Sequence, residues 1–121
     1  MTNYLIGGVI CFLIGWTAAA AEVLFREPER PNPFSGTPGM LFLLALAAVG
    51  AALGTGGLLW MFRAIPSSAV WIVIVGAGWG GWAASNWLNV NAAGAVNRLL
   101  VGLAGLLLFY GLVWRVFPPV P

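Results

Sequence analysis

The amino-acid sequence predicts an all-α integral membrane protein with four transmembrane helices in a compact bundle. Of its 121 residues, 61% are hydrophobic and only 7% are charged, whereas soluble domains carry about a quarter charged residues. Its mean hydropathy is +0.97. The apolar residues form long blocks, and a helix of about 20 residues crosses the roughly 30 Å hydrocarbon core of a bilayer. We therefore expect one transmembrane domain over residues 1–121.

Four apolar segments define the expected spans, at about residues 4–24, 39–62, 66–88 and 96–117. The segment 26–38 between the first two spans contains four prolines and alternating charges, which is typical of an extended aqueous loop. The other two connections are short, and short connections favour antiparallel neighbours in a bundle. An even number of spans places both termini on the same side of the membrane.

The first span contains the only cysteine and one acid. Cys11 lies inside an apolar run, so we expect a small buried hydrophobe and no intrachain disulfide. Glu22 lies near the end of the span. An ionisable group in a membrane helix is a functional candidate, but near a helix end it often reaches the interface, here with Arg26 four residues later as a partner.

The second span carries a GxxxG motif, Gly50 and Gly54, with Ala47 and Gly57 on the same stripe. Small residues four apart let two membrane helices approach closely. The motif does not say whether this contact lies within the chain or between chains, and we favour contact within the bundle.

The third span is the segment around which we expect the bundle to be organised. Pro66 suits its first turn, where no N–H is needed. At 100° per residue, one face carries Trp71, Trp79, Trp82 and Asn86. The other face carries small residues: Gly76, Ala77, Gly80, Gly81 and Ala84. The glycine face is expected to pack against a neighbouring helix, and the aromatic face is expected to offer a binding surface.

The fourth span has Arg98 in its first turn and Arg115 in its last. A guanidinium group suits phosphate geometry, so Arg98 is a candidate for holding a phosphate or lipid headgroup; the alternative is an interfacial anchor. Across the membrane, the arginines divide two against three, which gives almost no orientation bias. Three tryptophans near span ends fit the interfacial aromatic belt: Trp60, Trp87 and Trp114.

The composition argues against several function classes. Histidine is absent, which removes the commonest general base and metal ligand and the usual haem ligand. No nucleophile–base pair, metal cluster or phosphate-binding loop is visible, so we expect no enzymatic activity, no cofactor and no metal. Five arginines and no lysine are too few for a nucleic-acid surface. The expected partners are membrane lipid and other membrane helices.

The join between the second and third spans resembles the small multidrug resistance family of four-helix transporters, within the drug/metabolite transporter superfamily. That family shows an Ile-Pro at the start of helix three, then small residues, an aromatic and a Gly-x-Gly. The corresponding positions here are Ile65-Pro66, Ser67-Ser68, Trp71 and Gly76-Ala77-Gly78.

The resemblance implies a dimer, often antiparallel, in which helices one to three enclose a substrate chamber and helix four holds the dimer together. It also implies that Gly76 and Gly78 let helix three bend. One departure concerns the glutamate in helix one through which drug exporters couple to protons, since Leu13 occupies that position. The related lipid-linked aminoarabinose flippase subunits also lack it and are the closer functional analogy.

Two functions follow as expectations. The first is a transporter-like or flippase-like protein of the bacterial inner membrane that moves an amphipathic or lipid-linked substrate, as a homo- or hetero-oligomer. Its candidate substrate-binding residues are Trp16, Trp71, Trp79, Asn86 and Arg98. The alternative is a non-catalytic accessory subunit of a larger respiratory, photosynthetic or secretion complex, in which the glycine stripes and tryptophans dock against neighbouring subunits.

Overall fold

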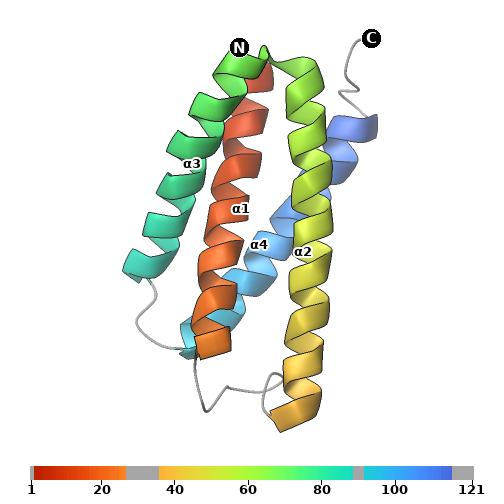
Figure 1. Ribbon diagram of the computed structural model, residues 1–121. Coiled ribbons are helices and arrows are strands. Elements are labelled where there is room, and N and C mark those ends of the chain that lie inside the picture. Colours follow the sequence, from red (N-terminus) through yellow and green to blue (C-terminus); the bar gives the residue numbers. More distant parts are fainter. Residues whose placement is uncertain (1, 27–35, 89–91, 116–121) are drawn as a thin grey trace.

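A computed structural model describes residues 2–26, 36–88 and 92–115. These residues form four helices, each long and apolar enough to cross a membrane (Figure 1). The expected all-helical, four-span fold is therefore confirmed. The helices are α1 (Thr2–Arg26), α2 (Gly36–Ala64), α3 (Ser67–Leu88) and α4 (Ala92–Arg115). The expected end of the last span at residue 117 lies outside the described residues.

Pro66 separates α2 from α3. The N–H of Ile65 donates to the carbonyl of Met61 at 2.9 Å and completes the hydrogen bonding of α2. The carbonyl of Pro66 then accepts from the N–H groups of Ala69 and Val70, at 2.9 and 3.1 Å. Because proline has no N–H to continue the α2 ladder, α2 stops here. Pro66 precedes the first turn of α3 rather than lying in it.

The central helix of the bundle is α1, not α3. The contacts of α1 with α3 are the most extensive in the bundle, followed by those with α4 and then α2. Figure 1 shows α1, in red and orange, between α3 and α2. Although α2 and α3 are joined by a short connection, they barely touch each other. The expectation that the third span organises the bundle, and that a short connection makes these two helices neighbours, is therefore wrong.

The backbones of α1 and α3 meet where they cross. A Cβ atom added at Gly15 would overlap the carbonyl oxygen of Gly78 and lie 2.9 Å from the backbone nitrogen of Trp82. A Cβ atom added at Gly81 would overlap the carbonyl oxygen of Phe12. Such an approach is open only to glycine, and it allows Cα–H···O contacts between the helices. These backbone contacts explain why α3 packs on α1 rather than on α2.

The α1–α2 contact places side chains of α1 in glycine notches of α2. A Cβ atom at Gly57 would lie 2.8 Å from Cγ2 of Ile10, and one at Gly54 would lie 3.3 Å from Cγ1 of Ile14. Ile10 lies in the N-terminal half of α1, and Ile14 lies at its middle. The glycines of the second span thus receive side chains from within the chain.

The α1–α4 contact follows the same pattern on another side of α1. A Cβ atom at Gly105 would lie 3.0 Å from Cδ1 of Leu13. A Cβ atom at Gly102 would overlap the hydroxyl oxygen of Thr17. Three helices therefore contact α1 through glycine positions, which accounts for its central place.

Two clusters of buried apolar side chains fill the bundle. The larger one includes Trp60, which is fully buried, so this tryptophan does not face the headgroups as the aromatic-belt prediction requires. It also includes Cys11, whose thiol lies 3.5 Å from the sulfur of Met61, so the expected burial of this cysteine is confirmed. The smaller cluster is formed by Ala20, Leu24, Leu43, Leu99 and Leu103.

The glycine crossing gives a test with a matched control. Gly81→Ala forces a methyl group into the backbone of α1, and overpacking of this kind costs about 1–3 kcal/mol. Gly80→Ala adds the same methyl group where no atom lies within 4 Å, and replacing a helical glycine by alanine is otherwise favourable by up to about 1 kcal/mol. We expect Gly81→Ala alone to lower the thermal midpoint of the purified protein in detergent, followed by circular dichroism. Equal midpoints for the two variants would argue against the crossing.

Candidate functional site

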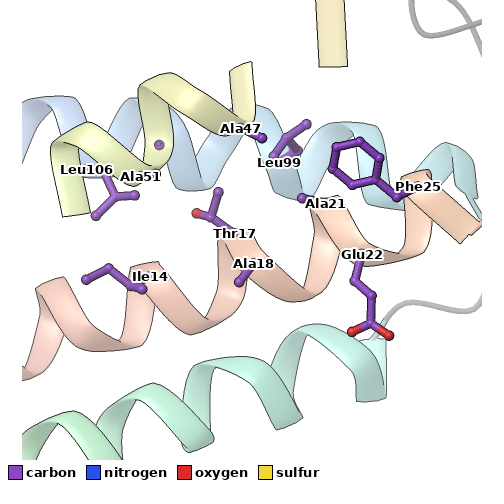
Figure 2. A pocket seen from close by; sticks show the side chains of 11 residues that line it. Ile14, Thr17, Ala18, Ala21, Glu22, Phe25, Ala47, Ala51, Leu99 and Leu106 are labelled. Atoms are coloured by element: carbon purple, nitrogen blue, oxygen red, sulfur yellow. The ribbon is translucent and has the colours of Figure 1, made fainter. Parts of the chain in front are cut away.

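A groove of about 600 Å³ lies between α1, α2 and α4. Figure 2 shows its lining side chains, and α3 contributes none of them. Ligand pockets in proteins usually enclose about 300–1,000 Å³, so the groove has the volume of a small-molecule or lipid-chain site. Its lining residues are Ile14, Thr17, Ala18, Ala21, Glu22, Phe25, Ala47, Gly50, Ala51, Leu99 and Leu106.

Small side chains on facing helices produce the groove. The groove is lined by Ala18 and Ala21 of α1 and by Ala47 and Ala51 of α2 (Figure 2). Larger side chains elsewhere hold the two helices apart. The alanine methyl groups are too short to fill the space between them. The groove is therefore a gap in packing that the sequence creates at specific positions.

The groove covers one half of the membrane-spanning part of the bundle. At its inner end, Ile14, Ala51 and Leu106 lie close to the midpoints of their spans, Asn3–Phe25, Gly36–Ala64 and Val96–Arg115. At its outer end, Phe25 lies one residue before the end of α1, and Leu99 lies near the start of the span Val96–Arg115. The rise from Ile14 to Phe25 is about 16 Å, close to half of the roughly 30 Å hydrocarbon core.

The interior of the groove is lined by carbon atoms. Thr17 turns its hydroxyl to Gly102 of α4 and its methyl group toward α2, where it lies 3.9 Å from the Cβ position of Gly50. Among the described residues, this buried hydroxyl has no hydrogen-bond partner. Glu22 lies at the outer end, and Figure 2 shows its carboxyl group pointing away from α2. Glu22 is half-buried and interacts with another group of the protein.

The structure does not bring the five predicted substrate-binding residues together. Trp71, Trp79 and Asn86 are exposed on the outer side of α3, with 60% and 73% of the two tryptophans accessible. Trp16 bridges α1 and α4, since its indole N–H donates to the carbonyl of Arg98 at 3.1 Å. The Arg98 side chain is half-buried and has a partner. Of the residues singled out in the sequence, Glu22, Ala47 and Gly50 line the groove.

The predicted packing glycines have different surroundings. Gly50 accommodates Leu103 of α4, whose Cδ2 lies 2.9 Å from the Cβ position. Gly78 lies at the crossing with α1, whereas Gly76 and Gly80 have no atom within 4 Å of their Cβ positions. Of the glycines on the predicted packing face of α3, Gly81 therefore contacts α1, whereas Gly76 and Gly80 lie beside open space. The hinge that the family resemblance implies at Gly76 and Gly78 stays a prediction.

The groove was missed in the sequence although its signal was present. Alanines recur on the second half of the first span and the first half of the second span, and unfilled space arises only where such positions face each other. The sequence analysis favoured large aromatic residues instead, and Trp71 and Trp79 are exposed on α3, outside the groove. Leu13, at the position of the transporter glutamate, packs against Gly105 of α4 and does not line the groove.

Comparisons with protein families, with characterised proteins and with solved structures find no match to this chain. The fold and the groove together define a multi-pass, four-helix membrane protein with an apolar site in one half of its spanning region.

The placement of the tryptophans can be checked by fluorescence. In vesicles with brominated acyl chains, we expect the exposed Trp79 to be strongly quenched, because bromine reaches it directly. Trp79→Phe should lower the quenchable share of the emission. Trp60→Phe serves as the control, since this side chain is fully buried and its removal should leave that share unchanged or larger. If Trp60→Phe lowers the quenchable share and Trp79→Phe does not, the aromatic face of α3 lies inside the protein.

Proposed function

We propose that this protein is a small transporter-like or flippase-like membrane protein that moves an amphipathic or lipid-linked substrate. The observation that carries the proposal is the apolar groove between α1, α2 and α4. A groove lined by methyl and methylene groups favours an apolar chain over a hydrated or charged solute, because burying a polar group without a partner costs several kcal/mol, about 2–7.

The distribution of charge supports the same substrate class. Among the described residues, Glu22 is the acid within a span, and it lies at the outer end of the groove rather than at mid-membrane. Exporters of cationic drugs need an acid that pairs with the cation in the membrane. A substrate whose polar group stays near the interface, with its apolar part in the groove, requires no such acid.

The helix packing suggests which parts move together. The backbone contact at Gly15 and Gly81 joins α1 and α3 closely. The lining residues that α2 contributes to the groove are all small: Ala47, Gly50 and Ala51. We therefore assign opening of the site to the α1–α2 gap, with α1 and α3 moving as a unit. Because the groove covers one half of the span, transport across the membrane is assigned to a dimer, in the inner membrane of a bacterium.

A second candidate function rests on the outer face of α3. Trp71, Trp79 and Trp87 are exposed there by 60%, 73% and 85%. A Cβ atom added at Gly76 or Gly80 would meet open space within 4 Å. Small residues and aromatic side chains suit a contact with another membrane helix. This face favours an accessory subunit that docks on a larger membrane complex.

Transbilayer movement of lipid tests the first function. The protein is reconstituted into vesicles that hold a headgroup-labelled fluorescent phospholipid, and dithionite reports the label in the outer leaflet. Wild type should move the label across the bilayer. Ala51→Phe fills the groove and should slow this movement on the order of tenfold, which corresponds to about 1.4 kcal/mol.

Ala52→Phe is the matched control, because Ala52 is exposed and next in sequence but does not line the groove. It should leave the rate unchanged. If wild type moves no more label than empty vesicles do, the transport proposal fails for this substrate class. Stable co-purification with larger membrane subunits, together with that result, would favour the accessory role.

A further inference from the structure

The groove is open along its side as well as at its end. Ala18 and Ala51 line it and are also exposed, so its long edge between α1 and α2 faces outward. Phe25 at the outer end is exposed too. In a membrane, the medium beside this edge is the hydrocarbon of lipid chains. Access to the groove is therefore sideways from the bilayer.

The depth of the groove matches one leaflet. It starts near Ile14 and Leu106 at mid-span and ends near Glu22 and Phe25. Its length of about 16 Å is close to half the roughly 30 Å hydrocarbon core. A chain that fills it has its free end at the centre of the bilayer and its polar end at the membrane surface opposite the start of α1.

No polar side chain interrupts this path before its outer end. The hydroxyl of Thr17 is turned to Gly102, and the remaining lining residues up to Glu22 are apolar. An occupant with polar groups along its length would leave them unpaired, whereas an acyl chain carries none. Phe25 lies about one turn beyond Glu22 at the outer end of the groove, and the headgroup starts at that end.

From these observations, we infer that the groove binds one acyl chain of a membrane lipid from the leaflet on the Glu22 side, entering sideways between α1 and α2. This inference rests on the part of the proposed function that makes the groove a binding site. It does not depend on the part that assigns transport to the protein. The lipid is held with its methyl end between Ile14 and Leu106 and its headgroup at the outer end of the groove, beside Phe25.

Photo-crosslinking with phospholipids tests the inference. Two phosphatidylcholine probes carry a diazirine, one at the end of the acyl chain and one next to the headgroup, in vesicles of unlabelled phosphatidylcholine. Mass spectrometry of the crosslinked peptides locates the labels. We expect the chain-end probe to mark Ile14 and Leu106 and the headgroup-end probe to mark Phe25. Labelling in the groove should exceed labelling at Val75 on the outer side of α3, which is 68% exposed.

Ala51→Phe should lower groove labelling on the order of tenfold, and Ala52→Phe should not. If Ala51→Phe fails to fold, Ala47→Phe fills the same groove, and the wild-type labelling pattern stands as a test without any variant. Even labelling of the groove and of Val75 would overturn the inference, since the lipid would then be annular only. The reverse depth order, with the headgroup-end probe at mid-span, would overturn it as well.

A competition arm distinguishes a membrane lipid from a free fatty acid, which has the same chain. Unlabelled phospholipid should compete with the probe, and the inference fails if only free fatty acid does so. Selective groove labelling without transbilayer movement would leave the lipid site intact and remove the transport function. Transbilayer movement of lipid without selective labelling of the groove would overturn the inferred lipid site and leave the transport function standing.

Discussion

The backbone contact between α1 and α3 is the interaction on which the arrangement of the other helices depends. Inside a bilayer, apolar surface gives no net drive for helices to associate, because lipid chains are as apolar as the side chains are. Close van der Waals contact must hold the helices together, and it is closest where backbones meet. Gly15, Gly78 and Gly81 permit that approach. With α3 fixed on α1, the remaining sides of α1 receive α2 and α4.

The groove is a consequence of how α2 is held. Toward the start of α1, Ile10 and Ile14 fill the notches at Gly57 and Gly54 of α2. At the far side, Leu24 of α1 and Leu43 of α2 join the smaller buried cluster. Between these two contacts, alanines face each other and leave space. The same small residues that allow close packing elsewhere produce a cavity here, because neither partner helix supplies a side chain that reaches across.

The proposed function follows from the chemistry of that space rather than from the residues that first attract attention. Tryptophans and an arginine suggest binding sites on inspection, but Trp71 and Trp79 are exposed on α3, far in sequence from the groove-lining positions. An apolar groove without a mid-membrane acid suits a lipid-like substrate better than a cationic one. The outer face of α3 then has a separate use, as a surface for other membrane helices.

The sequence by itself determined the four spans and the burial of Cys11, because hydropathy and length are properties of each segment alone. It also pointed to Glu22, the residue that marks the outer end of the groove. Only the tertiary structure decided that α1 is central, that Gly81 rather than Gly80 meets a neighbour, and where alanines face each other. A membrane helix is apolar on every side, so its sequence pattern does not fix its rotation or its partner. The rotation and the partner of each helix depend on how closely two backbones can approach each other. That distance depends on both helices together, so neither segment alone encodes it.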